Sequence, residues 1–202
     1  MSKMDEMVAV FPSSLLVHFT KSACYRFNSN FLDIISSRVL FKRRGDVEAD
    51  EAWRQLIPYV YLFNTNGTLL AYRRTKSGGE GRLHAQVSVG FGGHINEDDS
   101  TGDPKQLIQT AGMRELLEEL NFGGCLVRPL IPSGFLIAHD TPVDRVHFGV
   151  AFALQYSGVV KANDDECEII GWKTRNELLH DYNLESWSLR LLQQGVKEEL
   201  GD

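Results

Sequence analysis

The sequence predicts an α/β protein, built as an α/β/α sandwich around a mixed β-sheet. Two apolar, β-rich segments at 57–63 and 68–72 flank an Asn-Gly pair, which is a strong signal for a β-hairpin. A helix with an Asp-Pro start follows at 103–121. Further strands are predicted at 130–138, 146–157 and 168–173, and further helices at 174–179 and 186–200. Strands on both sides of a central helix, closed by a terminal helix, fit one sheet covered on both faces.

The first 55 residues form an extension ahead of the domain predicted over 56–202. This extension either covers an edge of the domain or builds a homodimer interface, and the sequence leaves both alternatives open. Its expected elements are short strands at 8–11 and 15–19, a helix at 31–40 and a charged connection at 41–50.

Composition restricts the class of partner. The 202 residues carry a net charge of −6, so no overall positive field draws the chain to a nucleic acid polymer or an anionic membrane. Three widely separated cysteines make no disulfide framework. No apolar run is long enough to span a bilayer, and the first residues lack a signal-peptide pattern. We therefore expect a soluble, cytoplasmic protein.

The helix over 103–121 carries an acidic face. Glu115, Glu118 and Glu119 are spaced i, i+3 and i+4, so their carboxylates emerge side by side. Like charges this close repel, whereas a hard divalent cation prefers clustered carboxylate oxygens. The pattern predicts a metal site. Two small residues one turn earlier, Ala111 and Gly112, either leave room for a metal-bound diphosphate or allow close packing against a strand.

Residues 114–119 read Arg-Glu-Leu-Leu-Glu-Glu, and Gly92-Gly93-His94 ends the strand predicted over 83–91. Together they resemble the Nudix box, which runs Gly, five residues, Glu, seven residues, Arg-Glu-apolar-X-Glu-Glu-X-Gly-apolar. The resemblance implies the Nudix-type sandwich, with 56–202 as the catalytic domain. It also implies Mg²⁺ or Mn²⁺ as cofactor and a small-molecule substrate, a nucleoside diphosphate linked to another group, with water attacking a phosphorus of the diphosphate bridge.

This chain departs from the box pattern twice. Asn121 replaces the helix-ending glycine, a mild change because asparagine tolerates the left-handed conformation. Counting back from Arg114 puts Gln106 and Ser100 where the first Glu and Gly belong. If Gly93 is instead the anchoring glycine, the loop carries seven extra residues. That loop either is a solvated insertion or supplies a replacement acid from Glu97, Asp98, Asp99 or Asp103.

By position in the box, the resemblance makes Glu118 and Glu119 metal ligands. Glu115 is a further ligand or the base that takes a proton from water, and Arg114 orients the carboxylates. The backbone oxygen of Gly93 completes the metal shell. In several Nudix subfamilies the base lies instead in a loop before the last strand, which corresponds to 163–168 here. There we favour Glu166 slightly over Glu168, against a solvated acidic loop.

Phosphate-binding candidates flank the strands that approach the Gly-Gly pair. Any one of these cations either grips a phosphate or is a surface charge: Arg73, Arg74, Lys76 and Arg82. His94 either touches substrate or caps the turn. Three strand tyrosines either stack on a base or, more commonly, pack in the core: Tyr59, Tyr61 and Tyr72.

Two other functions share this fold. One is isopentenyl-diphosphate isomerase, which uses a cysteine and a glutamate in motifs that none of Cys24, Cys125 and Cys167 matches. The other is a non-catalytic nucleotide sensor, a class that commonly loses box acids. Because three of the four box acids are kept here, the sequence favours hydrolysis.

Overall fold

The fold follows from side-chain alternation along the central strand β4 (Trp53–Phe63), which is buried almost throughout its length. In this computed structural model, Val60 joins an apolar cluster on one face of the sheet, and Tyr59 joins a second cluster on the other face. A strand buried on both sides needs covering layers on both sides. The structure describes residues 2–75, 86–99, 103–123, 129–163, 165 and 167–194.

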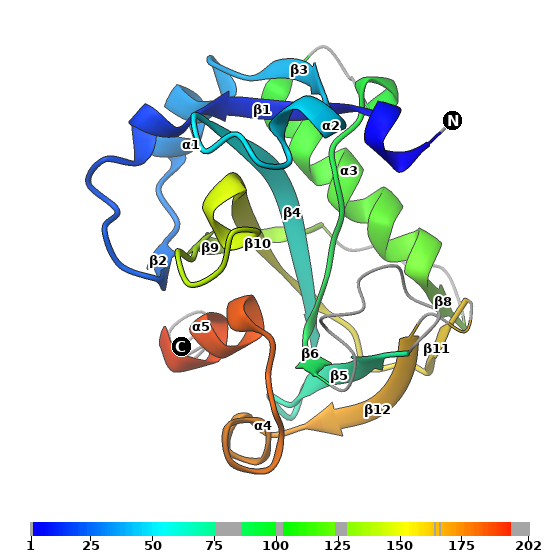
Figure 1. Ribbon diagram of the computed structural model, residues 1–202. Coiled ribbons are helices and arrows are strands. Elements are labelled where there is room, and N and C mark those ends of the chain that lie inside the picture. The colour runs from blue at the N-terminus through cyan, green and yellow to red at the C-terminus, as the bar shows by residue number, and fades with distance from the viewer. Residues whose placement is uncertain are drawn as a thin grey trace.

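Ten strands form one mixed sheet in the described part of the chain. They are β1 (Met7–Pro12), β2 (Ala23–Arg26), β3 (Leu40–Arg43), β4, β5 (Leu69–Arg74), β6 (Val87–Ser88), β7 (Gly90–Phe91), β9 (Ile131–Ile137), β10 (His147–Gln155) and β12 (Cys167–Lys173). The main order is β12-β5-β4-β10-β9-β2, and β10 runs parallel to β4 (Figure 1). A small second sheet pairs β8 (Leu120–Phe122) with β11 (Val160–Ala162).

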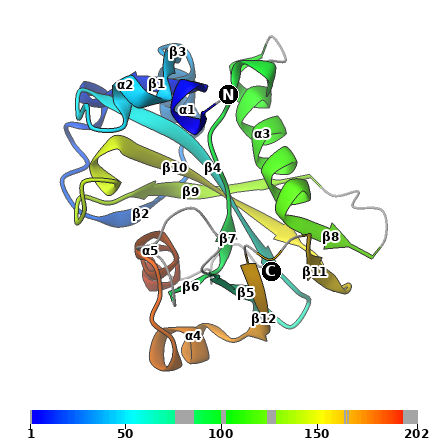
Figure 2. The same cartoon turned by 45° about the vertical axis from the view of Figure 1, so that its right-hand side comes forward.

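Helices cover both faces of the main sheet. Leu32 and Ile108 pack in the cluster of Val60, whereas Leu178 and Leu191 pack in the cluster of Tyr59. These residues belong to α1 (Ser29–Ser36), α3 (Pro104–Glu119), α4 (Arg175–Asp181) and α5 (Ser186–Gln194). Figure 2 shows α3 and α5 on opposite sides of β4. The predicted α/β/α sandwich is confirmed. Among the described residues, no helix is long and apolar enough to cross a membrane.

The predicted hairpin is confirmed. The Asn64 side-chain oxygen accepts the backbone N–H groups of Asn66 at 2.9 Å and Thr68 at 3.1 Å, which closes the turn. Gly67 has a φ of 73°, a left-handed conformation that explains glycine at this position. The turn leads directly into β5, so the second strand returns antiparallel along β4.

Residues 1–55 enter the main sheet. β1 pairs with β4 and β3, and β2 pairs with β9 at the sheet edge. The expected strand at 15–19 is wrong, because a 3-10 turn, η2 (Ser13–Leu16), buries Leu16 there. The charged segment 41–50 is more than a connection, since β3 and α2 (Arg44–Val47) lie in it. A charged segment can form a strand at a sheet edge, where its side chains remain in solvent. A homodimer interface stays a prediction.

The helix that carries the acidic face ends earlier than expected. α3 stops at Glu119, and Asn121 is the exposed middle residue of β8, paired with Lys161. The expectation that Asn121 ends the helix is therefore wrong. Its neighbours in β8 are both buried, so strand alternation places their apolar side chains inside and the asparagine outside.

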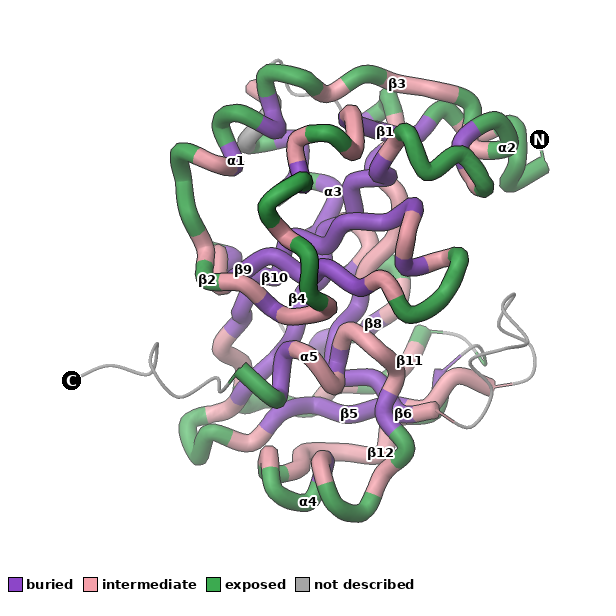
Figure 3. The backbone as a smooth tube through the Cα atoms, turned by 60° about the vertical axis from the view of Figure 1, so that its left-hand side comes forward, coloured by how far each residue is buried: buried purple, intermediate pink, exposed green. Residues whose placement is uncertain are grey.

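Ala111 and Gly112 serve packing. Ala111 is fully buried in the core, and a Cβ on Gly112 would lie 3.1 Å from the Cβ of Pro58 and 3.3 Å from Cγ2 of Val60. The small side chains let α3 approach β4 closely, which is the alternative of close packing against a strand. Figure 3 shows the buried core running through β4, β9 and β10 beside this helix.

Two caps fix the C-terminal helices. The predicted capping box of α4 is confirmed: the Thr174 hydroxyl accepts from the Glu177 N–H, and the Glu177 carboxylate accepts from the Thr174 N–H. At the start of α5, the Glu185 carboxylate accepts the N–H groups of Trp187 at 2.8 Å and Ser188 at 2.7 Å. Both helices therefore begin with satisfied backbone donors.

Candidate active site

α3 brings two of its three glutamates together around one arginine. Nη1 of Arg114 donates to Oε1 of Glu115 at 2.8 Å and to Oε2 of Glu118 at 3.2 Å. The Glu115 side chain is 16% exposed and that of Glu118 is 58% exposed, so one carboxylate faces inward and the other faces solvent. Glu119 is the last residue of α3, directly before β8.

The loop ahead of α3 supplies the partner of Arg114. Asp99 lies in η3 (Glu97–Asp99), and its carboxylate accepts from Nε of Arg114 at 2.7 Å and from Nη2 at 2.8 Å. Its Oδ2 also accepts the backbone N–H of Asn96 at 2.9 Å. The Asp99 side chain is only 4% exposed. Of the four acids proposed as replacements, Asp99 thus anchors the arginine with both oxygens, while Glu97 and Asp98 are exposed.

Gly92 and Gly93 allow the loop to pass close to α3 and β4. A Cβ on Gly93 would lie 2.4 Å from Oε2 of Glu115, and one on Gly92 would lie 2.1 Å from the Pro58 carbonyl oxygen. At Gly92 the clash is with backbone, so no side chain fits; at Gly93 a side chain would have to displace the Glu115 carboxylate. The Gly93 peptide is therefore held against the Glu115 carboxylate, where the box resemblance expects its backbone oxygen to contribute.

We expect Gly93→Ala to lower catalytic turnover at least tenfold, because the added methyl must displace the Glu115 carboxylate and small misplacements in a site are costly. Gly123→Ala is the matched control, since a Cβ there meets only one atom, at 3.8 Å. Steady-state kinetics of both variants check this result. Equal rates for Gly93→Ala and the wild type would show that the close approach is unimportant.

Burial raises the pKa of the Glu115 carboxyl, and the nearby charge of Glu118 acts in the same direction. The charge and hydrogen bond of Arg114 oppose this shift. Glu115 is thus the most buried of the carboxylates that Arg114 joins on α3, which suits a group that either binds a cation or takes a proton.

The donor set fits a hard divalent cation. Carboxylates of Glu115, Glu118 and Glu119 lie on one end of α3, and the Gly93 peptide lies against the first of them. These are oxygen donors, which Mg²⁺ and Mn²⁺ prefer. The positive charge of Arg114 keeps two of the carboxylates together without a cation.

The predicted phosphate-binding arginines lie on β5. Arg73 pairs with Glu168 across the register to β12, with 3.4 Å between Nη1 and Oε2, and both side chains are exposed. Nη2 of Arg74 lies 3.5 Å from the Tyr72 hydroxyl. Glu168, the second choice for the base, is therefore part of a surface ion pair. Three further candidates lie outside the described residues: Lys76, Arg82 and Glu166.

The strand tyrosines are core residues. Tyr59 is 5% exposed, Tyr61 is 1% exposed and Tyr72 is fully buried. Tyr72 stacks on Phe91 with 4.4 Å between ring centroids. The commoner of the two alternatives, packing, is confirmed for all three.

His94 acts through both its backbone and its side chain. Its carbonyl oxygen accepts from Nη2 of Arg114 at 3.0 Å. Its ring lies apart from the box acids, with Nε2 2.7 Å from Oε1 of Gln55 and the ring centroid 5.5 Å from that of His147. Burial lowers the pKa of His94, helped by the charge of Arg44, so the imidazole is neutral near pH 7.

The sequence did not predict which side chains lie next to the His94 ring. Glu48, His94 and His147 offer ligand atoms that all lie within 4.8 Å of one another. They come from the charged segment after α2, from the Gly-Gly turn and from the first residue of β10. No local spacing signals such a cluster, because only the folded sheet brings the three segments together.

Comparison with known proteins defines the class first. Tm1382, a candidate Nudix hydrolase, superposes with a TM-score of 0.77 at 25% identity, over 94% of this chain and 97% of that one. The Nudix hydrolase from Alicyclobacillus acidocaldarius matches 69% of this chain and 90% of its own, with a TM-score of 0.51 and 13% identity, a likeness of fold alone. The fold is that of the Nudix hydrolases.

The sequence then defines the family. Protein YmaB of Bacillus subtilis (strain 168) is 34% identical over 199 residues, which span 93% of this chain and 96% of YmaB. The chain belongs to the family of YmaB. No protein-family model matches it.

Proposed function

We propose that the protein is a metal-dependent hydrolase of a small molecule in which a nucleoside diphosphate is linked to another group. The observation that carries this proposal is the Arg114 cluster: one guanidinium, anchored by Asp99, holds Glu115 and Glu118 next to the Gly93 peptide. A purely structural helix gains little from keeping several acids on one face. A site for a phosphate-bound cation requires them.

Each residue of this cluster has a proposed task. Glu115, Glu118, Glu119 and the Gly93 backbone would hold Mg²⁺ or Mn²⁺, which when bound offsets phosphate charge and makes water a better nucleophile. Arg114 orients two of the carboxylates. The buried Glu115 and the acid of the 163–168 segment, Glu166, are the two candidates for the base that takes the proton from the attacking water. Arg73 and Arg74 are proposed phosphate contacts.

Incubation with a panel of candidate substrates tests this function. Dinucleotide polyphosphates, nucleotide sugars, ADP-ribose, coenzyme A and nucleoside triphosphates are incubated with the purified protein and MgCl₂. Release of phosphate, pyrophosphate or nucleoside monophosphate is then measured. We expect at least one compound to be cleaved, and chelation of the metal to stop the cleavage. A protein that binds a nucleotide but cleaves none of these compounds is a sensor, and the enzyme proposal then fails.

No observation favours the isomerase alternative. Cys24 and Cys167 are buried, the former on β2 and the latter at the start of β12. Neither lies on α3 or in the Gly-Gly turn, where the acidic cluster is built. Cys125 is outside the described residues. A cytoplasmic location stays a prediction.

A further inference from the structure

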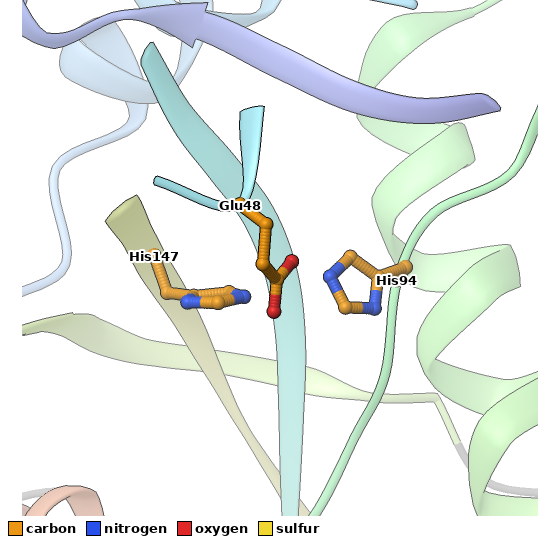
Figure 4. A group of neighbouring side chains, drawn as sticks. All are labelled: Glu48, His94 and His147. Carbon is orange, nitrogen blue, oxygen red and sulfur yellow. The ribbon is translucent and has the colours of Figure 1, made fainter. Parts of the chain in front are cut away.

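A second group of metal-ligating side chains lies apart from the acids of α3. Glu48 directly follows α2, His94 follows Gly92 and Gly93, and His147 begins β10. Their ligand atoms all lie within 4.8 Å of one another. Figure 4 shows the Glu48 carboxylate between the two imidazole rings, with a nitrogen of each ring directed toward it. The three side chains therefore converge on one point from three segments.

The orientation of His147 is set by the backbone. Its Nδ1 lies 2.8 Å from the carbonyl oxygen of Val143, and a carbonyl can only accept. Nδ1 therefore carries the proton, and in the neutral ring Nε2 carries the lone pair. Metal-binding histidines in proteins usually donate their second N–H to a carbonyl or carboxylate in this way. His147 is also buried, so this orientation is held by packing.

Polar neighbours fix the other two side chains. Oε2 of Glu48 accepts from Nε of Arg44 and from Nε2 of Gln55, both at 3.4 Å. Nε2 of His94 donates to Oε1 of the same Gln55 amide at 2.7 Å, so a cation bound at this nitrogen would shift the imidazole proton to Nδ1. Gln55 is fully buried, and its amide joins two members of the cluster by accepting from His94 and donating to Glu48. Arg44 also pairs with Glu6, so its charge is shared between two carboxylates.

We propose that Glu48, His94 and His147 form a binding site for a transition-metal divalent cation of the Zn²⁺ type, distinct from the acidic site on α3. Two imidazoles and one carboxylate are a ligand set that Zn²⁺ and related ions favour, whereas Mg²⁺ prefers oxygen ligands alone. Ligand atoms around Zn²⁺ lie about 3.3 Å apart at bond lengths of about 2.0 Å. The three ligand atoms now lie within 4.8 Å of one another and would have to approach to that distance on binding.

The site joins three parts of the chain that are far apart in the sequence. Glu48 belongs to the N-terminal 55 residues and His147 to the central strand β10. His94 is the residue whose carbonyl oxygen accepts from Arg114. A bound cation would therefore fix the Gly-Gly turn relative to both the extension and the sheet.

Zinc binding to the full-length chain tests the proposal. The protein is stripped with a chelator and titrated calorimetrically with ZnCl₂ in excess MgCl₂, which keeps the hard oxygen site supplied with its preferred ion. Metal content is measured after dialysis. We expect one Zn²⁺ per chain, with affinity lowered at least tenfold in Glu48→Gln and in His147→Gln. The absorption spectrum with Co²⁺ in place of Zn²⁺ reports nitrogen coordination directly.

Two controls separate this site from other sources of binding. His180→Gln removes an exposed histidine on α4, and Glu118→Gln removes an acid of α3; both should bind Zn²⁺ like the wild type. Absence of Zn²⁺ from the wild type overturns the proposal, as does equal binding by the wild type and Glu48→Gln. Loss of Zn²⁺ in Glu118→Gln alone assigns the ion to α3 and also overturns it. Glu48→Gln keeps the side-chain volume, so its Zn²⁺ affinity tests the site even if His147→Gln fails to fold. None of these readouts depends on hydrolysis.

Discussion

Glu118→Gln is expected to lower the rate of diphosphate hydrolysis about a hundredfold or more while leaving the fold intact. The side chain is 58% exposed and contributes one ion pair, to Arg114, so its removal changes stability by less than about 1 kcal/mol. Its proposed task is to bind the catalytic cation. Loss of a ligand removes several kcal/mol of charge stabilisation, and each 1.4 kcal/mol is a factor of ten in rate.

Kinetics over a range of MgCl₂ concentrations check this expectation, with thermal unfolding as the measure of fold. Raising the Mg²⁺ concentration should restore only part of the rate, because the remaining carboxylates bind the ion more weakly and in altered geometry. Glu97→Gln is a suitable control, since this exposed acid lies in η3, ahead of the same helix. A near-normal rate for Glu118→Gln at saturating Mg²⁺ would remove Glu118 from the site.

Asp99→Asn is expected to reduce both stability and activity. The carboxylate makes two hydrogen bonds to Arg114 and is almost fully buried, so its replacement leaves a charged guanidinium without its main partner. Breaking a buried pair of this kind costs about 2–4 kcal/mol of unfolding free energy. For a domain of this size, that corresponds to a fall of about 5–10 °C in the unfolding temperature. Turnover should fall about ten- to a hundredfold, because Arg114 orients Glu115 and Glu118.

Chemical denaturation and calorimetry measure the stability change, with Asp98→Asn as the matched control. Asp98 is the exposed neighbour of Asp99, and its substitution should change the unfolding free energy by no more than about 0.5 kcal/mol. Equal stability of the two variants would mean that the ion pair contributes nothing.

The ion pair between Asp99 and Arg114 should also make the free energy of unfolding depend on pH. Burial alone would raise the pKa of Asp99, but the hydrogen bonds from Arg114 and Asn96 outweigh it and hold the pKa below its ordinary value of 3.8. A carboxyl whose pKa is lower in the folded protein adds stability above its unfolded pKa and loses that contribution as the pH falls through its folded pKa. The difference in unfolding free energy between the wild type and Asp99→Asn should therefore shrink below about pH 4. A constant difference down to pH 2.5 would contradict this assignment.

Local patterns were sufficient for much of the fold. The Asn-Gly hairpin, the helix start at Pro104 and the capping box at Thr174 each depend on a few neighbouring residues. The strand β3 in the N-terminal region could not be predicted from local patterns. β3 is a charged strand at the sheet edge, and its strand conformation depends on pairing with β1, more than thirty residues earlier in the chain. A charged segment without that partner has no strand signal of its own.

The sequence by itself determined the acidic face of α3, because helical periodicity alone places Glu115, Glu118 and Glu119 together. It also identified Gly93, whose lack of a side chain fits the Glu115 carboxylate. Only the tertiary structure decided which loop acid meets Arg114, because Asp99 lies fifteen residues before it in the chain. The same holds for Glu48, His94 and His147, which meet only when β4 and β10 pair in parallel beneath α2. Contacts between distant segments depend on strand register, and register is a property of the whole sheet.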